Sequence, residues 1–85
     1  MPWTIENDYG GYGGIKYAAT TVEACQTDCS NNPDCTAIDW VAAKPAGKQC
    51  YLIGSWISHS EPRAGIQRHT INRECGQHLT YIWWN

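Results

Sequence analysis

Residues 20–30 decide the fold, and they read Thr20-Thr21-Val22-Glu23-Ala24-Cys25-Gln26-Thr27-Asp28-Cys29-Ser30. The hydroxyl of Thr20 can cap the N-terminus of a helix, while Glu23, three residues later, can bond back to the capping residue. The helix is expected to stop at residues 31–33, because the proline there disfavours helical geometry in the residue before it. Cys25 and Cys29 lie four residues apart, so both thiols face the same side. We therefore predict a helix through residue 30 whose cysteine-bearing side is buried if both thiols are bonded.

The segment after this helix predicts a β-hairpin. Residues 35–41 alternate and are rich in strand-forming residues. One face of this strand carries Ile38 and Trp40, and the other carries Cys35, Ala37 and Val41. A turn with a proline and a glycine at residues 42–48 then leads into a returning strand at residues 49–54. We expect this hairpin to pack on the helix.

Further short strands are predicted at residues 3–6, 15–18, 66–72 and 78–84. Residues 8–14 are predicted to form a loop anchored by its two tyrosines, because four glycines in five positions exclude a helix and a stable central strand. A phosphate-binding loop would need a lysine and a following helix, whereas a strand-like segment follows. Residues 55–65 are predicted to be a long surface loop. The fold class is therefore α+β, with one helix against a small, mostly antiparallel sheet.

The length and charge of the chain limit its functions. Its 85 residues allow a single domain, spanning residues 1–85, whose small core needs additional cross-links. The formal net charge of −2 leaves no basic face for nucleic acid. No apolar run approaches the roughly 20 residues that span a bilayer. The first residues lack the charged and apolar segments of a signal peptide, which fits a mature or excised domain.

The cysteine count indicates an oxidising compartment, in which small domains are disulfide-bonded. The five cysteines cannot all pair within the chain, so at least one is free or pairs outside it. A structural zinc site is the first alternative, but its ligands usually come in close pairs, and only Cys25 and Cys29 lie close together. Nothing places a histidine beside a cysteine as a catalytic base. We expect disulfides, with no metal and no cofactor.

Three segments together resemble the PAN/apple domain family. They are the two-cysteine helix at residues 21–29, the strand at residues 33–40 that ends in a tryptophan, and the Cys-Tyr-Leu strand at residues 49–52. The Asp-Tyr-Gly at residues 8–10 also resembles the approach to the second strand in this family. The resemblance covers residues 3–75, followed by an aromatic C-terminal strand at residues 78–84.

The resemblance implies a sheet of about five antiparallel strands that cradles one helix. It also implies that Cys25 pairs with Cys50 and that Cys29 pairs with Cys35. It assigns Trp40 to the core with Ile38 and Leu52, because this tryptophan matches the buried aromatic residue of the family. The implied function is that of a secreted, extracellular recognition or adhesion module, which binds proteins in some members and glycans in others.

One departure from the family pattern concerns Cys75. Apple domains join their termini through a cysteine near each end, but positions 1–20 contain none. Cys75 could be a reduced buried thiol, an interchain disulfide, or a residue whose partner is lost by truncation. The tail that follows, with Trp83 and Trp84, could pack as a strand, form a dimer interface or serve as a ligand platform.

The candidate ligand-binding residues lie where strands give way to loops. They are the aromatic and basic residues Tyr9, Tyr12, Trp56, His59, Arg63, Trp83 and Trp84. Tryptophan and tyrosine in place of phenylalanine suit half-wet binding surfaces, because each carries a polar group. Tyr51 is assigned a structural role, and His59, His69 and His78 are taken as surface histidines rather than a pH switch.

Three classes of function remain at this point. The first is a non-enzymatic module that binds a glycan or an extracellular protein. The second is a structural or self-assembling secreted protein, which would dimerise through Cys75 and the tryptophan-rich tail. An enzyme is the least favoured, because no pair of carboxylates has a spacing that places both across a cleft and a chain this short has little depth for a pocket.

Overall fold

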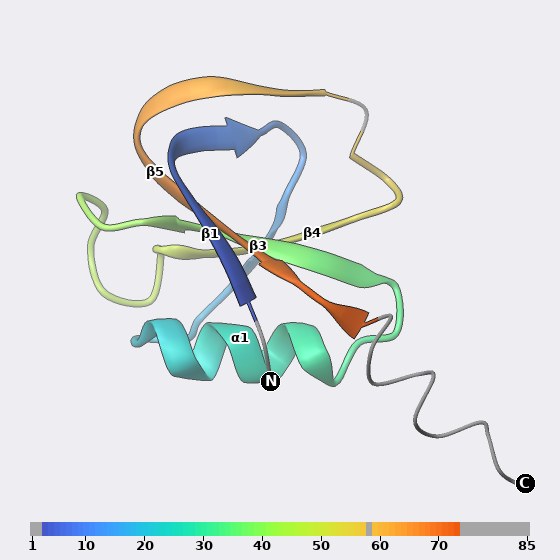
Figure 1. Cartoon of the computed structure of the whole chain (residues 1–85). Coiled ribbons are helices and arrows are strands. Elements are labelled where there is room, and N and C mark those ends of the chain that lie inside the picture. Colours follow the sequence, from blue (N-terminus) through green and yellow to red (C-terminus); the bar gives the residue numbers. More distant parts are fainter. Residues whose placement is uncertain (1–2, 58, 74–85) are drawn as a thin grey trace, which may run out of the picture.

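A computed structural model describes residues 3–57 and 59–73 of the chain. One helix packs along one side of a five-stranded antiparallel sheet (Figure 1). The elements in chain order are β1 (Trp3–Gly11), β2 (Ile15–Tyr17), α1 (Val22–Ser30), β3 (Cys35–Val41), β4 (Cys50–Gly54) and β5 (Ser60–Ile71). The strand order is β1-β5-β3-β4-β2, so the predicted hairpin forms its β3–β4 pair. The predicted fold class is confirmed.

The N-terminus of α1 is capped by Thr21 rather than by Thr20. Thr21 has an extended backbone, and its side-chain oxygen accepts a hydrogen bond from the backbone N–H of Ala24 at 3.1 Å. Val22, which packs against the core, is the first helical residue. Glu23 is then one position too early to return a bond to the cap, so the predicted capping box is wrong. Its carboxylate still lies in the first turn, where it favours the helix dipole.

The core lies between α1 and the sheet and consists mainly of cystine. Disulfides join Cys25 to Cys50 and Cys29 to Cys35, which are the pairs that the family resemblance implies. The six fully buried core residues are these four cysteines together with Ile38 and Leu52. Trp40 is half-buried and packs against this cluster. The helix is thereby cross-linked to both strands of the hairpin.

A bulge at the start of β3 corrects the predicted facing of Cys35. The register runs from Cys35 opposite Gly54 to Ala37 opposite Ile53, so two steps on β3 match one step on β4. This extra residue breaks the alternation. Cys35 therefore reaches the helix side, where it bonds Cys29, instead of sharing a face with Ala37.

Both predicted loops are partly strand. β1 continues to Gly11 and β5 begins at Ser60, and these ends pair with each other, with Tyr9 opposite Pro62 and Gly11 opposite Ser60. The loop prediction is wrong because residues 60–62 of β5 pair with β1 on one side only, where a proline is tolerated. β3 pairs with β5 only from residue 66 onward, so no strand lies on the other side of Pro62. The missing N–H of Pro62 therefore breaks no hydrogen bond to β3.

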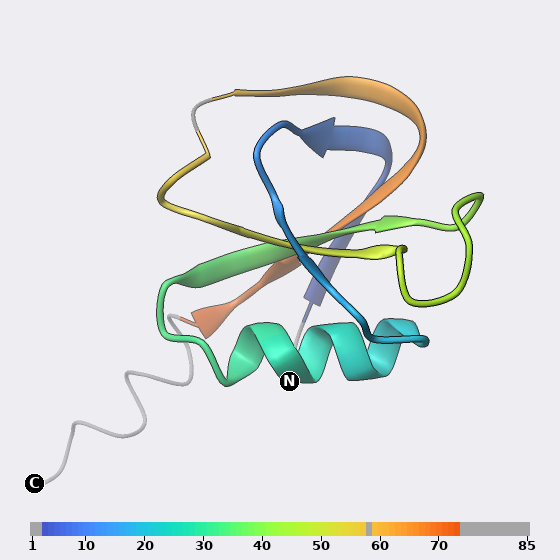
Figure 2. The same ribbon diagram turned by 180° about the vertical axis from the view of Figure 1, so that it is seen from behind.

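The β1–β5 ribbon bends sharply at Asp8 and Gly65. Both residues have positive φ, at 57° and 83°, and the register of the two strands shifts between Asn7 and Tyr9. The backbone N–H of Gly65 donates to the side chain of Asp8 at 3.0 Å, which fixes the bend. Figures 1 and 2 both show the far ends of β1 and β5 curling over the side of the sheet away from α1. The bend thereby shapes the face that carries the candidate site.

Candidate ligand-binding pocket

A pocket of about 330 Å³ lies on the sheet face opposite the helix. Cys50 and Leu52 of β4 face the helix core, so the intervening Tyr51 and Ile53 face away from it. The pocket is lined by residues from β1 and its following loop, from β3 and β4 and the turn between them, and from β5: Gly11, Tyr12, Gly13, Gly14, Asp39, Val41, Lys44, Tyr51, Ile53, Arg63, Ala64 and Ile66. The bent β1–β5 ribbon and the β3–β4 hairpin thus line it together.

A buried ion pair between Asp39 of β3 and Arg68 of β5 supports the pocket. The side chains of both residues are buried. The Nε of Arg68 donates to one carboxylate oxygen of Asp39, and the Nη2 donates to the other at 3.2 Å. The backbone N–H of Gly11 also donates to Asp39, at 2.9 Å. Both oxygens of Asp39 are therefore engaged, and the pair fastens β1 to β3 across the intervening β5.

Gly10 is required where β1 passes over this pair. A Cβ atom at this position would lie 2.8 Å from Cγ2 of Ile66 and 3.2 Å from Oδ2 of Asp39. Real Cβ atoms do not approach other atoms to 2.8 Å. One glycine of the glycine-rich stretch therefore permits close approach between β1 and the layer beneath it.

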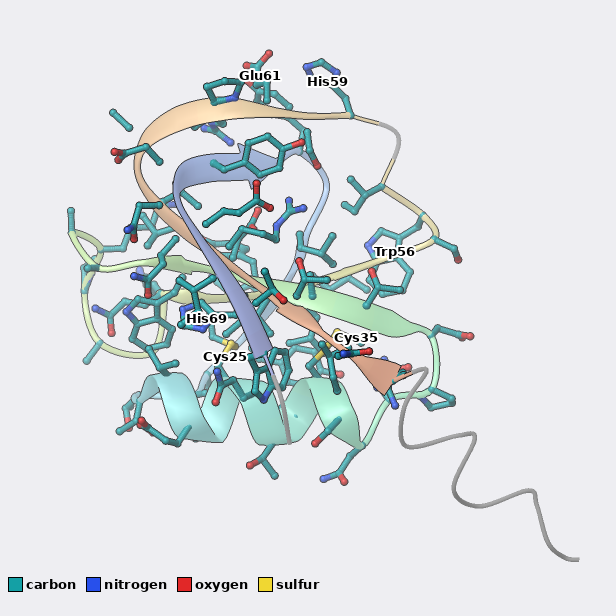
Figure 3. The ribbon with its side chains drawn as sticks, viewed as in Figure 1. Cys25, Cys35, Trp56, His59, Glu61 and His69 are labelled. Carbon is teal, nitrogen blue, oxygen red and sulfur yellow. A yellow bond between two sulfur atoms is a disulfide. The ribbon has the colours of Figure 1, made fainter. Side chains whose placement is uncertain are left out.

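Tyr12, His59 and Glu61 form a hydrogen-bonded cluster at the rim. The Tyr12 hydroxyl donates to Glu61 at 2.8 Å, and the Nε2 of His59 lies 2.8 Å from the other carboxylate oxygen. The rings of Tyr12 and His59 stack with centroids 5.8 Å apart. The hydrogen bond to Glu61 raises the pKa of Tyr12, and hydrogen bonds from His59 and then Tyr12 lower the pKa of Glu61. Figure 3 shows His59 and Glu61 together at the end of the molecule away from α1.

Two cation–tyrosine pairs line the pocket. The guanidinium of Arg63 lies 4.4 Å from the centroid of the Tyr12 ring, and its Nη1 donates to the carbonyl of Gly11 at 3.2 Å. The ammonium of Lys44 lies 5.0 Å from the centroid of the Tyr51 ring and donates to the Tyr51 hydroxyl at 2.9 Å. Within residues 3–57 and 59–73, neither cation forms an ion pair with a carboxylate.

Some of the residues predicted from sequence to bind a ligand lie at the pocket, and the others lie elsewhere. Tyr12 and Arg63 line the pocket, and His59 stacks on Tyr12 at its rim. Tyr9 lies against the guanidinium of Arg68, 5.3 Å from its ring centroid, and does not line the pocket. Trp56 lies apart from this group, beyond the end of β4 (Figure 3).

Trp56 has a packing role that its exposure does not suggest. It is 37% exposed, yet a Cβ atom at Gly54 would lie only 2.2 Å from its ring. The indole therefore covers a glycine at the end of β4. Trp83, Trp84 and Cys75 lie outside the residues that the structure describes, as does the predicted strand at residues 78–84.

Sequence reasoning missed several residues of the pocket. Lys44 lies in a predicted turn, Tyr51 has a predicted structural role, and Glu61, at the rim, lies in a predicted loop. The alternation of side chains along β3 and β4 is the one sequence signal for these residues. Asp39, Val41 and Tyr51 occupy the strand positions that do not face the helix.

His69 also differs from its prediction as a surface histidine. It is 3% exposed, on the helix side of β5, because it packs against Gln26 of α1. The Nδ1 of His69 lies 3.1 Å from the Gln26 amide nitrogen, and its Nε2 lies 2.6 Å from the Gln67 amide oxygen. Both contacts fit a neutral ring that accepts from Gln26 and donates to Gln67. Burial lowers the pKa of His69.

Neither a membrane-spanning helix nor a metal-holding cluster of side chains occurs in the described part of the chain. No helix there has the length and apolar character needed to span a membrane. Residues 3–57 and 59–73 also contain no group of three or more histidine, cysteine, aspartate or glutamate side chains arranged to hold a metal ion.

The comparisons with known proteins give one match. A family model described as the PAN domain matches residues 4–78, which is most of the chain. This match confirms the resemblance seen in the cysteine-bearing segments. Searches of curated proteins and of solved structures give no significant match.

Proposed function

Because the chain belongs to the PAN domain family, we propose that it is a non-enzymatic extracellular recognition module that binds a carbohydrate in the pocket opposite α1. Membership of this family points to a protein- or carbohydrate-binding module, and the choice of a carbohydrate rests on the shape of the site. Two disulfides in a chain of 85 residues are typical of the oxidising extracellular environment.

The concave shape of the pocket is the observation that carries this proposal. A volume of about 330 Å³ lies within the range of sites for small ligands, whereas protein partners usually meet flatter and larger surfaces. A saccharide unit presented on a longer glycan could enter a space of this size. A folded protein partner would reach only its rim.

The chemistry of the lining also suits a sugar. Tyr12 and Tyr51 offer flat apolar rings with polar hydroxyls, which match the apolar faces and hydroxyl edges of a pyranose. Val41 and Ile53 add apolar surface, while Lys44 supplies hydrogen-bond donors. Mixed apolar and polar lining of this kind fixes a small polar ligand in one orientation.

The carboxylate of the pocket is poorly suited to catalysis, which supports a binding role. Both oxygens of Asp39 accept hydrogen bonds from Arg68, and one of them also accepts from the backbone of Gly11. A general acid or base needs a free oxygen within reach of the proton that it transfers. Asp39 therefore serves as a structural anion.

The test is to fill the pocket without disturbing the core. Ala64 is exposed and lines the pocket, so Ala64→Trp is expected to occlude it. Ala46→Trp, in the exposed β3–β4 turn outside the pocket, is the matched control. On a glycan array, we expect the hits of the natural chain to persist in the control and to weaken at least tenfold in Ala64→Trp.

Two outcomes would contradict the proposal. Glycan hits that survive Ala64→Trp in a folded chain would place binding elsewhere on the surface. An array without hits, combined with capture of a protein from extracellular fluid, would favour a protein ligand. Dimerisation through Cys75 and the tryptophan-rich tail stays a separate prediction, because those residues lie outside the described part of the chain.

A further inference from the structure

We infer that the ligand of the pocket is an acidic sugar whose carboxylate is bound by Lys44 and Arg63. This inference rests on the proposed function, because it specifies the class of sugar that the same pocket takes. It follows from the charges in the lining, from the hydrogen-bond donors that these charges leave available, and from the charge of the whole chain.

The lining has an excess of positive charge. Lys44, Arg63 and Asp39 are its charged residues, and Asp39 is already neutralised by Arg68. Two cationic side chains therefore face the pocket without a carboxylate partner among the described residues. Glu61, at the rim, is hydrogen-bonded to Tyr12 and His59. The hydrogen bond from His59 lowers the pKa of Glu61 most, and Arg63, with which Glu61 forms no ion pair, lowers it only at longer range.

Both cations keep donors available for a ligand. Arg63 uses Nη1 to reach the carbonyl of Gly11, and its guanidinium lies over the face of Tyr12. Among the described residues, the Nε and Nη2 groups of Arg63 have no hydrogen-bond partner. These two groups can bind a carboxylate in a bidentate manner. The ammonium of Lys44 donates to the Tyr51 hydroxyl and has two further donors. The ring face of Tyr12 positions Arg63, and the hydrogen bond to the Tyr51 hydroxyl positions Lys44.

The positive pocket is a local feature of an acidic chain. The formal net charge is −2 at pH 7, so a general attraction to anions is not expected from the protein as a whole. An acidic ligand bound here would have to be bound by these two side chains. A neutral sugar would leave both cations without a counter-charge, whereas a carboxylate would supply one.

A planar carboxylate on a sugar ring satisfies both parts of the lining. Its two oxygens match the geometry of a guanidinium, and the point charge of a lysine can add a third contact. The ring that bears the carboxylate would lie against the tyrosine and aliphatic surface. A hexuronic acid therefore fits better than the matching neutral hexose.

The test compares matched pairs of sugars on the unsubstituted chain. Galacturonate is titrated against galactose and glucuronate against glucose, with binding followed through the amide spectrum of the labelled chain. We expect each acidic sugar to bind at least tenfold more tightly than its neutral partner at low salt. The preference is expected to shrink as salt is raised, because the charges lie near solvent.

Variants then assign the preference to the two cations. Lys44→Gln and Arg63→Gln are each expected to remove most of the acid preference, and Arg63→Lys to restore part of it. Lys48→Gln is the control, because Lys48 lies in the same turn, is exposed and does not line the pocket. It is expected to leave the preference unchanged.

The outcomes separate this inference from the proposed function. Equal binding of acidic and neutral sugars in the pocket would overturn the acid preference and leave the carbohydrate site standing. A loss of preference in Lys48→Gln as large as in Lys44→Gln would also overturn it, since a diffuse surface charge would then be responsible. Failure of every sugar to shift the pocket amides would overturn the proposed function itself.

Discussion

The two faces of the sheet are built from the same strands and differ in almost every property. The helix side carries two disulfides and the fully buried Ile38 and Leu52. The other side carries tyrosines, an ion pair and two cations around an open pocket. Adjacent residues such as Tyr51 and Leu52 belong to opposite faces. In a chain this short, the alternation of side chains along each strand places the core residues on one face and the pocket residues on the other.

The pocket side also contains buried residues that hold the fold, namely the Asp39–Arg68 ion pair together with Ile53 and Ile66. Asp39 and Arg68 join three strands there. Changes at this pair should therefore affect stability as strongly as changes on the helix side, whereas changes at exposed lining residues such as Lys44 should not.

Removal of the Asp39 carboxylate is expected to have the largest effect. Asp39→Ala leaves the charge of Arg68 buried without a partner and the N–H of Gly11 without its acceptor. Losing one member of a buried pair costs about 3–5 kcal/mol. Chemical denaturation measures this loss, and Asp39→Ala/Arg68→Leu should regain much of it. A double variant no more stable than the single one would show that the charge of Arg68 is not the cause.

Removal of the disulfides is expected to have the next largest effects, and they should differ in size. The Cys25–Cys50 bridge spans 25 residues and the Cys29–Cys35 bridge spans 6. On the loop-entropy relation, paired replacement by alanine should cost about 3.5 kcal/mol for the first and about 2 kcal/mol for the second. Thermal unfolding of the two double variants checks the order. Equal losses would indicate that loop closure does not set the contribution of each bridge.

A neighbouring pair on β4 tests the division of the two faces directly. Leu52→Ala is expected to cost about 2–5 kcal/mol, because it leaves a cavity in the core, and to leave the pocket lining intact. Tyr51→Ala should cost less stability, since Tyr51 is only half-buried, and should abolish ligand binding. Denaturation and sugar titration on both variants give the comparison. A Tyr51 variant that binds normally would remove this residue from the site.

The smallest effect is expected from pH, and it should act on the helix side. Burial lowers the pKa of His69, so the unfolded chain takes up this proton more readily than the folded chain. Stability is therefore full above the ordinary histidine pKa of about 6.5 and falls as the pH drops through that value. The loss levels off below the lowered pKa of the folded form. Unfolding midpoints measured from about pH 8 to about pH 5 should follow this course.

Two glutamine variants separate His69 from the other histidines. His69→Gln is expected to remove most of the decrease in stability over this pH range. His59→Gln, at the rim of the pocket, should retain it, because His59 is 57% exposed at its side chain. A decrease that disappears in His59→Gln instead would place the titrating group on the pocket side.

The sequence predicted the helix side of the fold well and the pocket side poorly. Cysteine spacing and the alternation of β3 and β4 are local signals, and they were enough for the helix and hairpin. Cys35 was placed on the wrong face because a bulge interrupts the alternation. The sequence does not distinguish Thr20 from Thr21 as the cap, because both carry the same hydroxyl. The packing of Val22 against the core makes Val22 the first helical residue and Thr21 the cap.

The pocket depends on pairing between distant segments, which sequence patterns do not record. Residues 9–11 and 60–62 form strands only because each is the partner of the other. The glycines and the proline in these segments are typical of loops, so their residue types do not predict strands. The bend depends on the hydrogen bond from Gly65 to Asp8, which lie 57 positions apart. Tyr12 and Arg63 were therefore identified as candidates by residue type, but their meeting in one site could not be foreseen.

The assignment of binding to the face opposite the helix is tested most directly by mapping ligand contacts on the amide spectrum of the unsubstituted chain during titration with the best sugar from the array. Binding in the pocket predicts that shifts concentrate at Gly11–Gly14, at Lys44, at Tyr51 and Ile53, and at Arg63–Ile66, while the amides of α1 stay unchanged. Shifts centred on α1, or around Trp56 beyond the end of β4, would contradict the assignment of binding to the face opposite the helix.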